Sequence, residues 1–191
     1  MTRRRSPTPD WDRLYELAAP QSGYFTLSQA REAGYSPPLV QHHLGAGRIE
    51  RVARGVFRLV HFPPSDHEDL VVLWLWSDRQ GVFSHETALM LHELSDVLPS
   101  SRHLSVPASW AHRRLRVPKR VILHFQDLAR TDVAWKGAVP VTTPLRTILD
   151  CTAAHVAPEL VGQAIEQSVQ RGYFARSELN RNRRRDQPAR P

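Results

Sequence analysis

Histidine and glutamate residues concentrate in residues 84–94, SHETALMLHEL, and such side chains can bind zinc or act as general bases. His85-Glu86 begins like a zinc-protease motif, which needs a second histidine four residues after the first so that both lie on one helix face. That position is Leu89, so zinc-protease chemistry is excluded. His85 and His92 share a helix face, but no nucleophile or third ligand is near them in the sequence. We expect a helix capped by Ser84, with its histidines as capping and surface groups, and no catalytic residue, metal or cofactor.

A second polar set lies in residues 142–150, TTPLRTILD. Thr142 or Thr143 suits a helix N-cap, and Pro144 suits the first helical position, where a missing N–H costs nothing. Arg146 then falls in the first turn, where the helix dipole disfavours a cation, and Asp150 follows four residues later. An arginine in this position usually has a partner elsewhere, and that partner is either a buried acid or a phosphate.

A nuclease is a further alternative, but the sequence gives it little support. A metal-dependent nuclease core would use an acid-x-Lys pattern on a strand, and Asp132 and Lys136 do not have that spacing. Glu159 and Glu166 lie on a helix far along the chain. Cys151 is the single cysteine, so no internal disulfide forms, and it is expected to be a small buried residue.

The candidate DNA-reading side chains lie in residues 36–58. Gln41, which can pair with adenine in the major groove, lies with His42 on a helix face opposite to apolar residues. Arginines on a following hairpin would reach phosphates or the minor groove, and phosphate contacts position a protein without reading sequence. The candidate DNA contacts are Ser36, Gln41, His42, Arg48, Arg51, Arg54 and Arg58. The alternative is a winged helix that binds protein instead of DNA.

Short helices and a hairpin would position these residues. Thr26 and Gln29 have capping-box spacing, and Gly34 ends the helix that they begin. Ser36, followed by Pro37, caps a second helix that ends near Gly45 or Gly47. Two β-rich runs, 48–52 and 56–60, flank a three-residue loop that ends in glycine. With a first helix from residue 10, the pattern predicts a winged helix-turn-helix.

The fold class that we expect is α+β. A Pro-rich break at residues 61–64 indicates a domain boundary after residue 62. Helical runs then alternate with β-rich runs at 103–106, 121–125 and 135–141, which predicts a mixed domain with a small sheet and several helices. The expected order is a flexible basic arm (1–9), a DNA-binding domain (10–62), an α+β effector domain (63–180) and an Arg-rich tail (181–191).

Positive charge is concentrated at both ends of this 191-residue chain, whose formal net charge is +7. Residues 1–62 hold nine Arg and five acids, residues 176–191 hold six Arg and two acids, and the segment between is nearly neutral. This clustering favours a nucleic-acid partner. A coding bias towards arginine would explain why the basic residues are mostly Arg and rarely Lys. It would not explain why the middle of the chain has a net charge near zero. No apolar run approaches the ~20 residues of a bilayer span, and no secretory signal is seen, so we expect a cytoplasmic protein without a membrane partner.

Residues 24–36, 44–49 and 52–59 resemble the N-terminal winged helix of the AbiEi antitoxins of type IV, abortive-infection toxin–antitoxin systems. Residues 84–89, SHETAL, resemble the family's Ser-His-x-(Ser/Thr)-Ala-Leu stretch, and residues 142–150 resemble its Thr-x-Pro-x-Arg-Thr-x-x-Asp stretch. The family positions that carry over are Ser84, His85, Thr143, Pro144, Arg146 and Asp150. Glu93 stands where the family often has a small residue such as Gly.

The resemblance implies a transcriptional autorepressor that binds double-stranded operator DNA, usually at inverted repeats, for example as a monomer that binds the repeats cooperatively. It also implies a C-terminal domain that counters a nucleotidyltransferase toxin, often without a stable complex. One rival is a winged-helix-targeted nuclease or phosphotransfer enzyme, as in endonuclease-like relatives, using His85 and Asp150. The other is an interaction module without DNA affinity.

Overall fold

The structure is a computed structural model that describes residues 8–186. The chain divides into two compact units, one up to Gln80 and one from Gly81 onward. The expected basic arm lies outside the described residues except for residues 8 and 9, and so does the end of the Arg-rich tail, residues 187–191.

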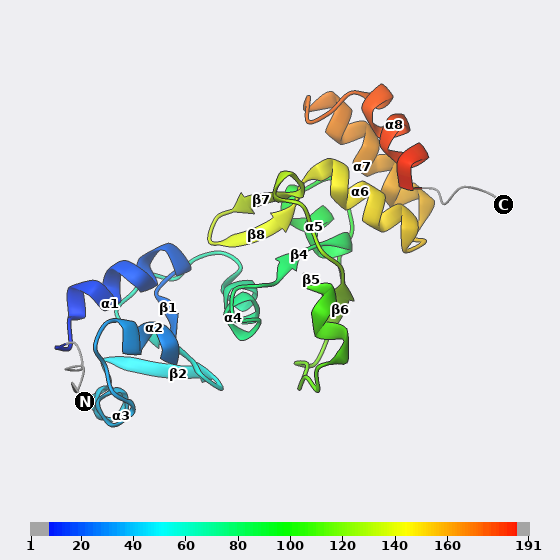
Figure 1. Cartoon of the computed structure of the whole chain (residues 1–191). Helices are drawn as coiled ribbons and strands as arrows, with labels where there is room; N and C mark the ends of the chain where they lie inside the picture. The colour runs from blue at the N-terminus through cyan, green and yellow to red at the C-terminus, as the bar shows by residue number, and fades with distance from the viewer. Residues whose placement is uncertain (1–7, 187–191) are drawn as a thin grey trace. The chain divides into compact units, whose positions relative to one another are not determined.

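The first unit contains three helices and a small antiparallel sheet, followed by a fourth helix (Figure 1). The sheet has the strand order β1-β3-β2. The elements are α1 (Trp11–Ala18), η1 (Ala19–Gln21), β1 (Tyr24–Thr26), α2 (Leu27–Glu32), α3 (Pro37–Gly45), β2 (Ile49–Ala53), β3 (Val56–Leu59) and α4 (Glu68–Trp76). This is the arrangement of a winged helix, in which α2 and α3 form the helix-turn-helix and the β2–β3 hairpin forms the wing.

Local sequence signals account for the starts of α2 and α3. The Thr26 Oγ1 accepts a hydrogen bond from the Gln29 N–H at 3.2 Å, and the Gln29 Oε1 accepts one from the Thr26 N–H at 2.9 Å. This reciprocal pair confirms the predicted capping box. Ser36 occupies the N-cap position of α3, but its side chain makes no capping hydrogen bond. Pro37 therefore contributes more to the start of α3 than Ser36 does, because its ring already holds a helical φ.

A single apolar core holds the winged helix together. It joins α1, α2, α3 and the sheet through Leu14, Ala18, Phe25, Ala30, Val40, Ile49, Phe57 and Leu59, all of which are buried. The first unit extends beyond the boundary expected after residue 62, because α4 contacts β1 and β3. The Pro-rich segment at residues 61–64 is thus a connection within this unit.

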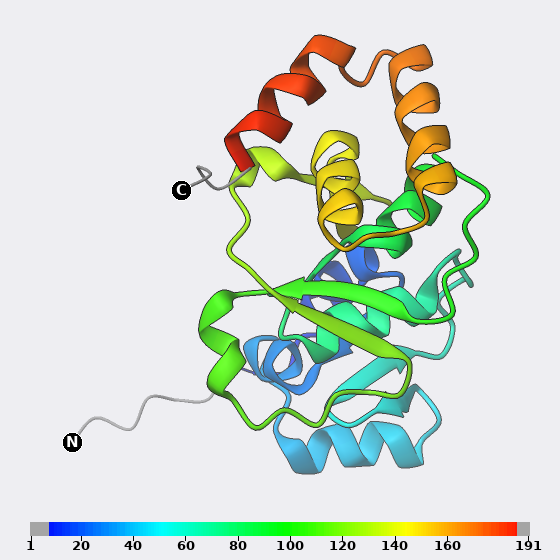
Figure 2. The same cartoon turned by 90° about the vertical axis from the view of Figure 1, so that its right-hand side faces the viewer.

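The second unit is a mixed sheet with helices (Figure 2). The strand order is β6-β5-β4-β8-β7; β5–β6 and β4–β8 are parallel, and the other pairs are antiparallel. Its elements are β4 (Val82–Phe83), α5 (His85–His92), β5 (Arg102–Val106), η2 (Ala108–His112), β6 (Val121–Phe125), η3 (Arg130–Asp132), β7 (Val133–Lys136), β8 (Val139–Thr142), α6 (Pro144–Ala153), α7 (Pro158–Gln170) and α8 (Arg176–Asp186). The α+β fold class is confirmed.

The sequence predicted one strand over residues 135–141, and this prediction is wrong. Residues 135–141 form a hairpin of two strands, β7 and β8, and not one strand. Gly137 lies between them with φ +55°, a left-handed conformation that glycine adopts without steric cost. The chain therefore reverses at this point, and β8 leads directly into α6.

Helices α5, α6, α7 and α8 share an apolar core beside the sheet. Its buried members include Leu89, Ile148, Ala164 and Leu179. Cys151 lies in the same core and is fully buried, as expected, and burial raises its thiol pKa to about 12. Among residues 8–186, no helix is both long enough and apolar enough to cross a membrane.

Candidate functional site

Helix α3 presents two polar side chains on its outer face. Gln41 and His42 are exposed, whereas Val40 is buried in the core. The neighbouring His43 is buried, and its ring centroid lies 5.5 Å from that of Trp11 and 5.4 Å from that of Tyr35. Burial lowers the pKa of His43, with the charges of Arg48 and His42 acting in the same direction. One histidine of the pair thus faces the core, as expected, and the other is free to meet a ligand.

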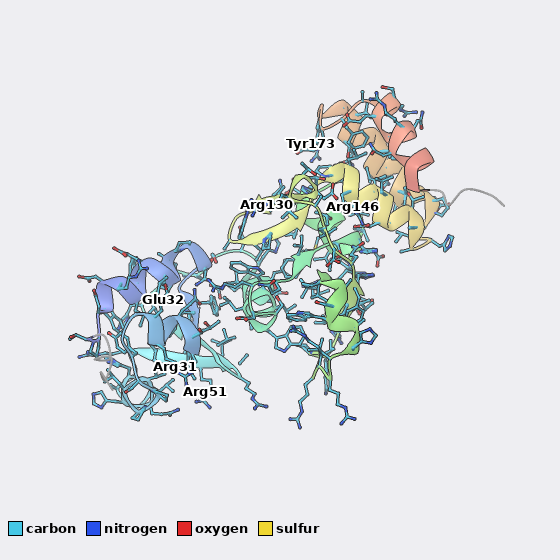
Figure 3. All side chains as sticks on the ribbon, in the orientation of Figure 1. Arg31, Glu32, Arg51, Arg130, Arg146 and Tyr173 are labelled. Carbon is cyan, nitrogen blue, oxygen red and sulfur yellow. The ribbon has the colours of Figure 1, made fainter. Side chains whose placement is uncertain are left out.

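Three exposed arginines lie on the wing or just before it. Arg48 precedes β2, Arg51 lies within it, and Arg54 lies in the hairpin turn. The Arg51 guanidinium lies 5.6 Å from the centroid of the Phe57 ring. Figure 3 labels Arg51 on the wing strand. Helix α3 contacts β2, so these cations lie on elements next to the helix that carries Gln41 and His42.

The sequence predicted that Arg58 contacts phosphate from the wing. In the structure, its side chain points to acidic partners within the unit. Its side chain is only 14% exposed and lies 3.5 Å from a Glu50 carboxylate oxygen and 3.4 Å from one of Glu68. It also donates a hydrogen bond to the Phe62 carbonyl at 3.0 Å. Since these partners belong to the same unit, Arg58 has a structural role between β3 and α4. Its guanidinium is therefore less accessible to a phosphate than those of the exposed Arg51 and Arg54.

Tyr24 extends the same buried network. Its hydroxyl donates to a Glu68 carboxylate oxygen at 2.8 Å, and the Arg58 guanidinium lies 5.6 Å from the centre of its ring. Burial, followed by the bond to Glu68, raises the pKa of Tyr24 to about 12. The Ser65 N–H, followed by the Tyr24 hydroxyl, lowers the pKa of Glu68. Glu68 therefore stays ionised and joins the start of α4 to the sheet.

In the second unit, Ser105 and Gln126 connect the motif at residues 84–89 with the motif at residues 142–150. Ser84 and His85 lie at the start of α5, and the His85 Nδ1 lies 2.9 Å from the Ser84 Oγ. The Ser105 hydroxyl donates to the Ser84 Oγ at 2.8 Å and accepts from the Gln126 Nε2 at 2.7 Å. The Gln126 Oε1 then accepts a hydrogen bond from Arg146 at 2.7 Å. A chain of hydrogen bonds therefore runs from His85 to Arg146.

Arg146 has protein partners on three sides. Its Nε donates to the Asp150 Oδ1 at 2.9 Å, and its Nη1 lies 3.5 Å from the Asp132 Oδ2. The side chain extends from α6, as labelled in Figure 3. Asp150 is buried, and burial raises its pKa although Arg146 acts in the opposite direction. Of the two partners considered for Arg146, the structure supplies the buried acid.

Thr143 and Pro144 shape the backbone rather than the polar network. Thr143 is the N-cap of α6 without a side-chain capping bond, and Pro144 is the first helical residue. The Thr143 N–H donates to the Asp132 carbonyl at 2.8 Å, which holds η3 against the start of the helix. Arg146 and Asp132 are thereby brought within reach of each other.

The expectation that His85 and His92 are capping and surface groups is wrong. His85 is 5% exposed and His92 is 3% exposed, because α5 is covered on the face that bears them. The His92 Nε2 lies 2.7 Å from the Thr142 carbonyl oxygen, so His92 joins α5 to β8. His92 is therefore a buried structural residue.

His85 belongs to a group of three histidines that the sequence did not suggest. His103 on β5 and His124 on β6 lie beside it, and one ring nitrogen from each of the three lies within 4.8 Å of those of the others. Burial, followed by the nearby histidines, lowers the pKa of His85 to about 3, and burial lowers that of His124 to about 4. Burial also lowers the pKa of His103, although Glu86 opposes this. A lowered pKa favours the neutral imidazole, which is the form that can bind a metal ion.

An open pocket of about 500 Å³ adjoins the histidines and the arginine network. His85, His124, Gln126 and Asp150 supply its polar lining, and apolar lining comes from β6 and the end of α6. The only sequence signal for this arrangement was the alternation along two strands, His103 with Ser105 and His124 with Gln126. Pairing of β5 with β6 places these residues on one sheet face.

Comparison with known proteins identifies the winged helix. Residues 12–60 match the family described as "Transcriptional regulator, AbiEi antitoxin". No curated protein matches the chain. Among solved structures, the chain is similar to the crystal structure of the RV2827C protein from Mycobacterium tuberculosis, with 18% identity and a TM-score of 0.42 over 76% of this chain. The match covers 60% of that protein's length.

The matched segment contains α1 from its second residue onward, the helix-turn-helix and the whole wing. These elements carry the exposed Gln41 and His42 and the exposed arginines. Over residues 12–60, the chain matches the model of the AbiEi antitoxin family of transcriptional regulators, in agreement with the resemblance seen in its sequence.

Proposed function

We propose that this protein is the antitoxin and transcriptional autorepressor of a type IV toxin–antitoxin operon. The winged helix binds double-stranded operator DNA, and the second unit counters a nucleotidyltransferase toxin without a stable complex and without catalysis. The observation that carries the DNA-binding half is the family match over residues 12–60, whose exposed side chains include Gln41, His42 and the wing arginines. A monomer that binds inverted repeats cooperatively is the form that we propose.

In this proposal, α3 enters the major groove and the wing lies along the backbone. Gln41 offers the paired amide donor and acceptor that suit adenine, and His42 lies next to it. Arg48, Arg51 and Arg54 contact phosphates, which supply most of the affinity and none of the sequence preference. Ser36 lies at the exposed N-terminus of α3, where a backbone phosphate is also favoured.

Binding of the full chain to its own upstream duplex, compared with a scrambled duplex at several salt concentrations, tests this half of the proposal. Arg51→Ala should weaken binding to both duplexes and flatten the slope of log K against log[salt] by about one. Arg130→Ala, which removes an exposed arginine from the second unit, is the matched control and should leave the slope unchanged. Equal affinity for both duplexes in the wild-type chain would refute operator recognition.

Base reading is tested separately from phosphate contact. Gln41→Ala should cost roughly 1–3 kcal/mol on the cognate duplex and much less on the scrambled one. Because Gln41 is exposed, this change should leave the fold intact. An equal loss on both duplexes would contradict the assignment of Gln41 to a base edge.

The antitoxin half is tested in cells by co-expression with a nucleotidyltransferase encoded beside this chain. The wild-type chain should restore growth, and Arg51→Ala should restore it equally while losing repression of the operon promoter. That separation is expected because the proposed DNA contacts and toxin-countering elements lie in different units. If the wild-type chain does not restore growth, the antitoxin half is refuted while the repressor half stands.

A further inference from the structure

Three histidines of the second unit converge in a way that neither proposed activity requires. His85 comes from the start of α5, His103 from β5 and His124 from β6. The His103 Nδ1 lies 3.0 Å from the His124 Nε2, and the ring centroids of His85 and His124 are 3.6 Å apart. Each histidine offers one ring nitrogen, and all three nitrogens lie within 4.8 Å of one another.

These separations suit a tetrahedral metal ion. At zinc–nitrogen distances of about 2.0–2.1 Å, two nitrogen ligands of a tetrahedral site lie about 3.3 Å apart. The 3.0 Å pair, which forms a hydrogen bond here, is close to this value. The three rings are stacked with interplanar angles of 27°, 13° and 16°, so they must rotate for their nitrogens to point at one ion. Imidazole nitrogen is the ligand type shared by Zn²⁺, Cu²⁺ and Ni²⁺, whereas Mg²⁺ and Ca²⁺ prefer oxygen.

The surroundings of two of the three rings orient them as ligands. The His103 Nε2 lies 3.1 Å from a Glu86 carboxylate oxygen, so this nitrogen donates its proton and the Nδ1 keeps its lone pair. On His85, the Nδ1 lies 2.9 Å from the Ser84 Oγ, which leaves the Nε2 for a ligand. A carboxylate behind a metal-binding histidine is a recurrent feature of zinc sites.

The same geometry leaves a coordination position open. His85 and His124 line the 500 Å³ pocket, so an ion held by the three nitrogens would face that space. Three protein ligands with one position left for water or another small ligand is the pattern of an open zinc site. The remaining polar lining, from Gln126 and Asp150, would face a molecule bound there.

We propose that His85, His103 and His124 form a binding site for a divalent transition metal of the zinc type, with Glu86 orienting His103 and one coordination position open to the pocket. This site is independent of the DNA-binding surface, which lies in the other unit. A test of the metal site is therefore independent of any test of the repressor function.

The test is titration of the tag-free full chain, stripped with a chelator, with Zn²⁺ and separately with Mg²⁺. We expect one Zn²⁺ per chain by calorimetry and elemental analysis, and no heat from Mg²⁺. Glu86→Gln should lower the Zn²⁺ affinity about 10–100-fold. His124→Gln should lower it further, and His112→Gln, a change at an exposed histidine of the same unit, should leave it unchanged.

The outcome that overturns the proposal is absence of stoichiometric Zn²⁺ binding, or binding that His124→Gln leaves intact. Circular dichroism at each step shows whether a variant is folded. If His124→Gln does not fold, X-ray absorption of the zinc-loaded wild-type chain decides instead. Three imidazole ligands at about 2.0 Å would support the site, and fewer than three would refute it.

Discussion

Arg146 and Asp150 lie one turn apart on α6, and the Arg146 Nε donates to the Asp150 Oδ1 at 2.9 Å. The carboxylate is 7% exposed, and its second oxygen is buried without a hydrogen-bond partner in the described structure. Arginine preceding aspartate is the weaker orientation for a pair on one helix, so helix stability alone does not explain the pair. The pair instead forms one end of the chain of hydrogen bonds that leads through Gln126 to His85.

Arg146→Met should destabilise the second unit in a pH-dependent way. Burial already raises the pKa of Asp150, and loss of the arginine would raise it further. A carboxyl group whose folded pKa exceeds its unfolded value stabilises the fold at low pH, and that contribution is lost as pH rises through the folded pKa. The cost at pH 7 should approach the ~3–5 kcal/mol of a broken buried pair and be smaller near pH 4.

Urea unfolding at the two pH values measures this cost. Arg130→Met, a change at an exposed arginine of the same unit, is the control and should have little effect at either pH. A cost that is equal at pH 4 and pH 7 would contradict the role of Arg146 as the counter-charge of Asp150.

Arg58→Met should affect stability and leave DNA binding almost unchanged. The change removes contacts with Glu50, Glu68 and the Phe62 carbonyl and should cost roughly 1.5–3 kcal/mol, as for hydrogen bonds to charged groups. The salt dependence of DNA binding, measured below the unfolding temperature, should match that of the wild-type chain. If Arg58→Met flattened the slope of log K against log[salt] by about one and left stability unchanged, Arg58 would be a phosphate contact after all.

Tyr24 should make stability fall at alkaline pH. Its pKa is about 12 in the folded chain, against an ordinary value of 10. The contribution is therefore fully present below pH 10 and is lost as pH rises through 12, by about 2–3 kcal/mol. Unfolding of Tyr24→Phe between pH 9 and pH 11.5 should show a smaller loss than the wild-type chain. Tyr15→Phe, at an exposed position, should keep the wild-type loss.

Glu93→Gly should stabilise the second unit. Glu93 ends α5 in a left-handed conformation with φ +54°, which an L-residue adopts at a cost and glycine adopts freely. Its carbonyl accepts a hydrogen bond from Arg171 at 2.9 Å, and that bond does not need the Glu93 side chain. We expect a gain of about 0.5–1 kcal/mol in thermal unfolding. A similar gain from Glu93→Ala would show that the side chain, not the backbone, is responsible.

The winged helix could be predicted from the sequence because its signals are local. The capping box at Thr26 and Gln29, Pro37 after Ser36, and the glycine of the wing turn each act within a few residues. These signals specify where helices and turns begin and end without knowledge of distant contacts. The spacing of apolar residues on α3 likewise indicated which side would be exposed, so Gln41 and His42 could be placed in advance.

The partners of charged and buried residues were decided only by the tertiary structure. The sequence predicted Arg58 as a cation of the wing that contacts phosphate, but in the fold Glu68 of α4 lies beside it. The sequence predicted His85 as a surface residue, but in the fold it is buried. The three histidines are separated by about twenty residues each, and only the pairing of β5 with β6 and the position of α5 unite them. Local propensity acts over one or two turns, whereas side-chain partnership depends on packing between elements far apart in the chain. Local sequence signals were therefore sufficient to predict the winged helix, whereas the hydrogen-bond chain and the histidine group of the second unit follow from packing between distant elements.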